Sequence, residues 1–112
     1  MKPFTPMGKT YVIPADTSAP TGVQVIADSQ YQPKSGGSVR IFNSGAVVVH
    51  VGWGGTAAKA TANSVAAVAG TPRNSLVIAP GAVEVIGVPD GSYFSGISAS
   101  AVSLYMTAGE GI

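Results

Sequence analysis

Short runs in which apolar and polar residues alternate recur along the chain. Within Val102–Thr107 the apolar Val, Leu and Met alternate with Ser, Tyr and Thr. Between Val47 and Trp53 every second residue is apolar, and His50 falls on the opposite side of the pattern. Because successive side chains of a strand point to opposite faces of a sheet, both runs are typical of strands with one buried face.

The same pattern predicts eight short strands. Their ranges are Thr10–Pro14, Val23–Ala27, Ser38–Phe42, Ala46–Gly52, Leu76–Ala79, Val83–Val88, Tyr93–Ile97 and Ala101–Thr107. Turn-forming residues separate them, and Asn43-Ser44-Gly45 is expected to form a tight hairpin because Asn and Gly tolerate positive φ. Further hairpins are expected at Ala79–Gly81 and Pro89–Ser92, with a weaker signal at Ala99-Ser100.

Composition strengthens the prediction of an all-β fold. The chain holds fifteen valines against two leucines, and β-branched side chains favour strands over helices. Its 15 glycines and 8 prolines fall mostly between the apolar runs, where turns need them. Eight antiparallel strands in 112 residues predict a β-sandwich, with a jelly roll as the first choice of topology. An immunoglobulin-like sandwich is the nearest alternative, although the chain lacks the cysteines typical of that fold.

Two segments depart from this pattern. Residues 1–21 contain Pro3, Pro6, Pro14 and Pro20, so we expect an extended N-terminal arm with one short strand, followed by the sandwich domain in residues 22–112. Residues 54–75 are rich in small residues and too long for a structureless loop in a compact domain. They are expected to hold a short helix around residues 61–68, or to form a loop that a partner orders.

Charge limits the classes of partner. Lys and Arg number 6 and Asp and Glu number 5, so the net charge of +1 argues against an electrostatic nucleic-acid interface. Charged residues make up only 10% of the chain, against about 25% in an average protein. A surface so poor in charge is expected to be buried against other protein, including copies of itself as a two-fold dimer or, alternatively, a trimer. No apolar run approaches the roughly 18 residues of a membrane span, so no membrane contact is expected.

Motifs that would carry chemistry are mostly missing. Gly52–Ala57 fits G-x-G-x-x-A, but the acid expected about 20 residues on is lacking, so a flexible glycine loop is expected instead of a nucleotide site. His50 is the only histidine, and a lone histidine in a strand is more often structural than catalytic. The acids are scattered and cysteine is absent, so no metal site, no cofactor and no enzymatic activity are expected.

Three aromatic residues are candidate partner contacts. Phe4 and Tyr11 are apolar anchors within the proline-rich arm, which is expected to lie against a neighbouring subunit. The alternative is that residues 11–13 form an ordinary sandwich strand behind a loose tail. Trp53 is interpreted first as an aromatic residue of the core or of its rim, and second as an exposed anchor for a partner or sugar.

The hairpin-and-turn pattern also carries a family resemblance. Ser38–Val51, with the turn Asn43-Ser44-Gly45, and Ala79–Gly111, with Ala79-Pro80-Gly81, resemble the small head decoration or cement proteins of tailed bacteriophages. The resemblance implies a non-enzymatic β-sandwich, often a jelly roll, on the exterior of the virion capsid. Its partner would be the major capsid protein, whose neighbouring subunits it clamps. A receptor- or glycan-binding module of a phage tail fibre or adhesin is the alternative function.

Overall fold

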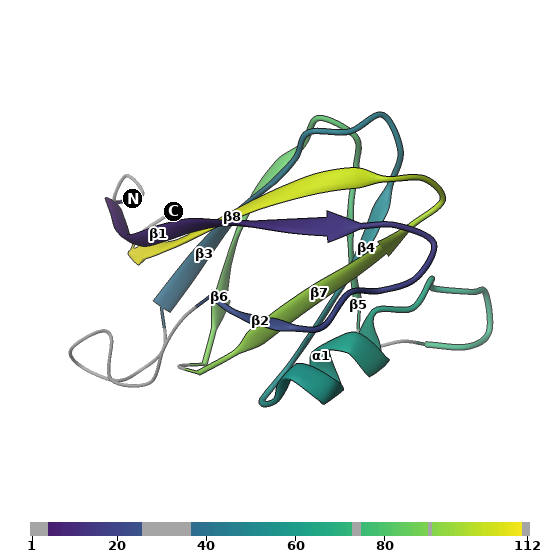
Figure 1. Ribbon diagram of the computed structural model, residues 1–112, viewed down its shortest axis with the longest axis horizontal. Coiled ribbons are helices and arrows are strands. Elements are labelled where there is room, and N and C mark those ends of the chain that lie inside the picture. The colour runs from purple at the N-terminus through teal and green to yellow at the C-terminus, as the bar shows by residue number, and fades with distance from the viewer. Residues whose placement is uncertain (1–4, 26–36, 73–74, 90, 111–112) are drawn as a thin grey trace.

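The computed structural model describes residues 5–25, 37–72, 75–89 and 91–110, and the chain folds there as a β-sandwich (Figure 1). Its elements are β1 (Thr5–Ala15), β2 (Val23–Gln24), β3 (Gly37–Asn43), β4 (Val49–Gly54), α1 (Ala57–Asn63), β5 (Ser75–Ile78), β6 (Val83–Val88), β7 (Tyr93–Ser98) and β8 (Val102–Glu110). Each predicted strand has a counterpart, so the all-β prediction is confirmed. Of the predicted strand Val23–Ala27, the last two residues lie outside the described part of the chain.

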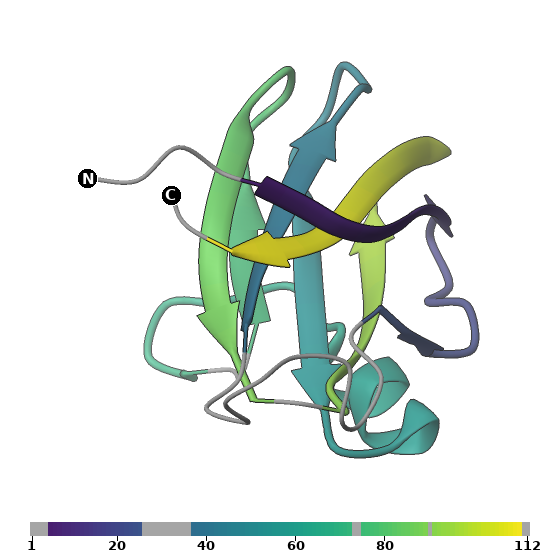
Figure 2. The same cartoon turned by 90° about the vertical axis from the view of Figure 1, so that its left-hand side faces the viewer.

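Each sheet has four strands, and every strand pair within the sheets is antiparallel. One sheet has the order β1-β8-β3-β6 and the other the order β2-β7-β4-β5. The pairs are nested, because β1 lies beside β8, β2 beside β7, β3 beside β6 and β4 beside β5. The first and last strands run side by side in both views of the ribbon (Figure 2).

The four expected hairpins are wrong, because each of those turns carries the chain from one sheet to the other. β3 and β6 belong to one sheet, whereas β4, β5 and β7 belong to the other. The turn Ala79–Ala82 does form, with the amide of Ala82 donating to the carbonyl of Ala79 at 3.1 Å and Gly81 at φ +71°. The presence of a turn is thus predictable from the local sequence. Whether the two strands that it connects pair in one sheet or lie in different sheets depends on strands that are distant along the chain.

Gly45 has a different role from the expected one. It is not among the glycines with positive φ, which in the described ranges are Gly70, Gly81 and Gly91. A Cβ atom on Gly45 would come within 2.6 Å of a methyl group of Val102. The glycine therefore allows the loop after β3 to lie against the start of β8.

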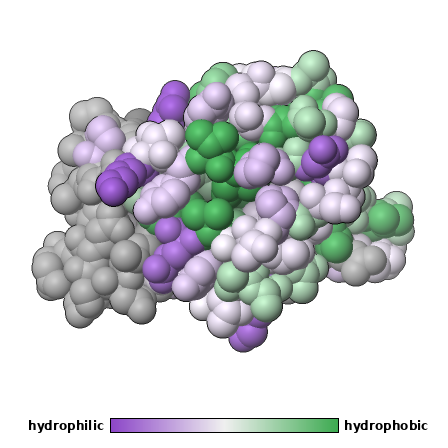
Figure 3. All heavy atoms as spheres, viewed as in Figure 1, coloured by the Kyte–Doolittle hydropathy of each residue, from purple (hydrophilic) through white to green (hydrophobic). Residues whose placement is uncertain are grey.

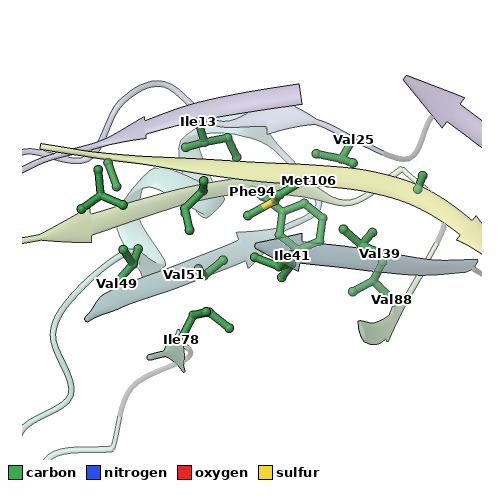
Figure 4. Close-up of a cluster of buried hydrophobic side chains, with 14 residues drawn as sticks. Ile13, Val25, Val39, Ile41, Val49, Val51, Ile78, Val88, Phe94 and Met106 are labelled. Atoms are coloured by element: carbon green, nitrogen blue, oxygen red, sulfur yellow. The ribbon is translucent and has the colours of Figure 1, made fainter. Parts of the chain in front are cut away.

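The core lies between the two sheets and is built by alternation along each strand. From β8 it receives Val102, Leu104 and Met106, which the sequence pattern placed on one face, and also Ala108. Figure 4 shows the side chains of both sheets meeting in this layer, with Phe94 beside Met106. The branched aliphatic side chains fill the space between two pleated surfaces, and their burial stabilises the sandwich.

Asn43 is the largest of the buried polar residues that the structure describes, and its side chain links the loop before β4 to the end of β5. Its amide nitrogen donates to the carbonyls of Val47 at 2.9 Å and Ile78 at 3.1 Å, and its side-chain oxygen accepts from the amide of Gly45 at 2.9 Å. The side chain is completely buried, so these hydrogen bonds replace those that water would make. The bond to Val47 also holds residues 44–48 in a loop, and this delays the start of β4 relative to the predicted Ala46.

The N-terminal segment contributes a longer strand than expected. β1 runs from Thr5 to Ala15 and pairs with β8 from Glu110 to Val102, with a register shift between Pro6 and Thr10. It lies at the edge of its sheet. Prolines are tolerated in an edge strand, because one side of the strand has no neighbour that needs an N–H donor. Over residues 5–15 the expected arm is therefore an edge strand of the sandwich.

The helix in the small-residue segment begins and ends earlier than the predicted residues 61–68. It spans Ala57–Asn63 and is capped by Thr56, whose hydroxyl accepts from the amide of Lys59 at 3.2 Å. It packs on the outer face of the β2-β7-β4-β5 sheet, with Ala60 completely buried (Figure 1). The segment is thus ordered here by its own sheet.

The glycine pattern in this region serves that packing. Gly52 and Gly54 belong to β4 and face the helix, so the expected flexible glycine loop is wrong. A Cβ atom on Gly52 would collide with the backbone of Asn63 and Ser64, and one on Gly54 would lie 2.7 Å from the Cβ of Lys59. Small residues on both surfaces let the helix approach the sheet at backbone distance.

Candidate functional site

The outer face of the β1-β8-β3-β6 sheet carries a row of apolar side chains. The pairing registers place Val12 beside Tyr105, Tyr105 beside Phe42, and Phe42 beside Val83. All four side chains point away from the core, because the residues that alternate with them are the inward ones. The row therefore crosses the full width of the sheet at one level.

Most of this row is open to solvent. Val12 is 51% exposed, Val83 43% and Tyr105 38%, whereas Phe42 is half-buried. The rings of Phe42 and Tyr105 stack with their centroids 6.1 Å apart and their planes 25° apart. The stacked rings lie along a sheet surface rather than in a groove, and offset stacking of this kind holds both rings in place.

The next row on the same face is more polar. It runs Thr10, Thr107, Arg40 and Val85 in register across the four strands. The hydroxyl groups of Thr10 and Thr107 are hydrogen-bonded at 2.7 Å. Arg40 is exposed and supplies the one formal charge in the two rows. An apolar row bordered by polar side chains is the usual composition of a protein-binding patch.

The predicted partner contacts lie elsewhere. Tyr11 points inward from β1 and Trp53 inward from β4, and both are half-buried against the core cluster. They belong to different sheets, so the structure does not bring them together on one surface. Phe4 lies outside the described residues.

Sequence reasoning missed the apolar row for a definable reason. Alternation had already assigned Tyr105 to the polar side of the last strand. What joins it to Val12, Phe42 and Val83 is the register between strands that are far apart along the chain, and no local pattern encodes that register.

A second feature is a hollow on the outer face of the other sheet, beside α1. Its volume is about 420 Å³, and its lining includes the side chains of His50, Ile97, Val48 and Ala66. His50 and Ile97 are cross-strand neighbours on β4 and β7. Thr17 closes one side, because the preceding residue is bridged to Ile97. The hollow is therefore largely aliphatic, with one imidazole in its wall.

The groups near this imidazole are engaged in local hydrogen bonds. The hydroxyl of Ser98 donates to the carbonyl of Ser100 at 2.6 Å, and the carboxylate of Asp16 accepts from the amide of Thr17 at 2.8 Å. Within the described residues there is no Ser–His–acid chain of hydrogen bonds of the kind that activates a nucleophile.

Neither a metal centre nor a membrane-spanning helix is found among the described residues. No group of three or more His, Asp or Glu side chains lies close enough together to hold a metal ion. The one helix in these ranges is too short to cross a membrane.

Comparisons with protein-family models, with curated protein sequences and with solved structures find no match to this chain. The described residues define the class of protein as a two-sheet antiparallel β-sandwich, with one apolar row on the outer face of the β1-β8-β3-β6 sheet.

Proposed function

We propose that the chain is a non-enzymatic virion structural protein that decorates and stabilises a bacteriophage capsid. It would bind the capsid exterior and clamp neighbouring subunits of the major capsid protein. The observation that carries this proposal is the apolar row Val12–Tyr105–Phe42–Val83, which crosses the outer face of the β1-β8-β3-β6 sheet. An exposed apolar row on an open sheet face fits another protein surface, whereas a small ligand needs a concave site.

The fold supports the proposal through its topology. We infer that the sandwich is a jelly roll, because its nested pairs and the orders 1-8-3-6 and 2-7-4-5 are those of one long hairpin rolled into two sheets. Jelly rolls are frequent in viral capsid and lectin domains. Topology alone does not decide function, so the outer face of the sheet is the main support for the proposal.

The low charge of the chain supports burial of that face in an assembly. In the view of Figure 3, hydrophobic and weakly polar residues cover much of the coloured surface, and strongly hydrophilic ones are scattered. With 10% charged residues, a free monomer has little to keep its apolar surface soluble. We therefore include self-association in the proposal, as a two-fold dimer or, alternatively, a trimer.

A capsid-binding experiment tests the function. Purified chain is mixed with shells assembled from the major capsid protein of the same phage, and the bound fraction is measured by co-sedimentation. The Tyr105→Lys variant is expected to bind at least about tenfold more weakly, because it places a charge in the middle of the apolar row. The control is Val77→Lys, which alters an exposed apolar residue on the other sheet.

Two results would contradict the proposal. One is the absence of wild-type co-sedimentation with the shells. The other is equal loss of binding in Tyr105→Lys and Val77→Lys, because the face would then not be specific. Circular dichroism of both variants verifies that each is folded.

The second candidate function is a receptor- or glycan-binding module of a phage tail fibre or adhesin. The hollow beside His50 favours it, since a concave site of about 420 Å³ suits a small ligand. Its lining contains no tryptophan, tyrosine or phenylalanine against which a sugar ring would stack, and this places it second. Titration with a glycan library would support this candidate if a sugar bound to wild type and not to His50→Ala.

A further inference from the structure

The four edge strands of the sandwich differ in how they are protected against pairing with another chain. An edge strand presents unpaired N–H and C=O groups, and proteins usually block such edges with prolines, lysines, bulges or very short strands. β1 contains Pro6, Lys9 and Pro14 and a register shift. β2 has two residues and β5 has four. Three of the four edges are therefore blocked.

β6 is less protected than the other three. It is six residues long, Val83–Val88, contains neither proline nor lysine, and has no described strand on its other side. Its one protective residue is Glu84 near its start, which lies opposite buried Ile41 on the inward face and leaves the four residues after it without a charge. Gly87 adds no obstacle, since a Cβ built there would meet no atom within 4 Å. Among the described elements only β3 packs extensively against β6, so none of them covers this edge.

We propose that β6 pairs antiparallel with β6 of a second copy of this chain about a two-fold axis. The β6 edge is thus the surface for the self-association in the proposed function, and the inference rests on that self-association. The two four-stranded sheets would join into one continuous sheet of eight strands. Backbone hydrogen bonds between the copies would supply the affinity, as in other cases of strand addition.

The side chains of β6 are compatible with a copy of itself. Directly opposite residues in an antiparallel pair lie on the same face, so two-fold registers centred on Val85 or Ile86 bring together residues of like orientation. In the first register Val85 meets its own copy and Glu84 meets Ile86, and in the second Glu84 meets Val88. Neither register places the two glutamates opposite each other. An isologous contact of this kind closes at two copies.

The pairing also explains why the apolar row ends at an open edge. Val83 is the last member of the row and lies on β6 itself. In the dimer the outer faces of both copies form one surface, with an apolar row in each half. A large partner would then meet two copies of the apolar row on one continuous surface.

A single-cysteine scan tests the pairing, because the chain contains no cysteine. Variants with one cysteine at Glu84, Val85, Ile86 or Gly87 are oxidised, and the disulfide-linked dimer is measured on a non-reducing gel. A two-fold pairing predicts that the position at the centre of the register links fastest, with its neighbours slower by about tenfold or more, because a disulfide needs Cα atoms about 4.4–6.8 Å apart. Val12→Cys on the opposite edge is the matched control.

Sedimentation and hydrogen exchange complete the test on the unmodified chain. We expect a species of about twice the monomer mass of 11.1 kDa, and slower exchange of alternate β6 amides as the protein concentration rises. Val85→Lys is expected to raise the dimer dissociation constant by about tenfold or more, whereas Val77→Lys, on an edge strand of the other sheet, leaves it unchanged.

Several outcomes would overturn the inference. They are a monomer at all concentrations, crosslinking of Val12→Cys as fast as the best β6 position, or a dimer whose β6 amides exchange as in the monomer. Failure of capsid binding is a separate result. A β6 dimer that does not bind shells would refute the proposed function and retain this inference, and a capsid-binding chain without β6 pairing would do the reverse.

Discussion

Asn43 shows how a single buried polar side chain can hold several connections of a β-sandwich. Its amide reaches backbone groups of the loop before β4 and of the end of β5, while its own backbone is bonded to the turn before β6. A hydrophobic residue of similar size would leave these backbone groups buried without partners.

Replacement of Asn43 by alanine should therefore be costly. We expect the free energy of unfolding to fall by about 2–4 kcal/mol, because buried carbonyl and amide groups lose their hydrogen bonds. Urea denaturation measures the change. Ser44→Ala is the control, since its exposed hydroxyl makes one hydrogen bond, to the carbonyl of Ser103. A loss for Asn43→Ala no larger than that for Ser44→Ala would contradict the role assigned to the buried amide.

Two neighbouring glycines separate packing from flexibility. Gly52→Ala introduces a methyl group where the end of α1 already lies, so stability should fall by about 1–3 kcal/mol. Gly55→Ala places the same methyl group in open space and should change stability by less than about 0.5 kcal/mol. Thermal unfolding of both variants checks the pair. Equal destabilisation would mean that backbone conformation, and not helix packing, requires these glycines.

At the scale of the element, the first and last strands of the chain contribute unequally to the stability of the fold. β1 is an edge strand, and its residues before Thr10 lie beyond the register shift. β8 is a central strand, flanked by β1 and β3, and supplies four buried residues to the core. The protein should therefore fold after removal of part of β1, but not after loss of β8.

Deletion of residues 2–9 tests the edge strand. The six register pairs from Thr10 to Ala15 remain, so the protein should fold and its Tm should fall by no more than about 4–8 °C, the equivalent of about 1 kcal/mol at this size. If the segment clamps a neighbouring subunit, as the capsid proposal expects, the truncated protein should bind shells more weakly in the co-sedimentation assay. Unchanged shell binding and unchanged oligomeric state would make residues 2–9 a passive tail.

At the scale of the whole molecule, the nested pairing makes folding depend on both ends of the chain. β1 and β8 are neighbours although nearly the entire sequence separates them, so the closing pair forms only when both ends are present. Such non-local pairing costs loop-closure entropy before contacts are gained, and it favours an all-or-none transition.

A chain that ends at Ala101 should accordingly fail to fold. Without β8, the edge strand β1 loses its partner and the core loses side chains that include Leu104 and Met106. We expect no cooperative thermal transition and weak amide protection in hydrogen exchange. A chain that ends at Glu110 retains all of β8 and serves as the control. A cooperative transition in the shorter chain would show that the remaining strands form a domain of their own.

The sequence by itself determined the all-β class, the approximate position of each strand, the inward face of β8 and the turn at Ala79–Ala82. These features follow from local physics: side-chain alternation, the preference of β-branched residues for strands, and the conformations open to proline and glycine. It also located Trp53 correctly at the rim of the core in its first interpretation.

Only the tertiary structure decided which strands pair. The turns that were expected to form hairpins connect the two sheets instead, and Gly45 leaves space for Val102. The helix lies at Ala57–Asn63, where Gly52 and Gly54 of β4 allow it to pack closely on the sheet. The apolar row on the outer face was also decided by the tertiary structure, because Val12 and Val83 are aligned only through the registers of β1 with β8, β8 with β3 and β3 with β6. Pairing and register are set by the burial of one face of every strand at once, and this is a property of the assembled sheets that no local segment of the chain contains.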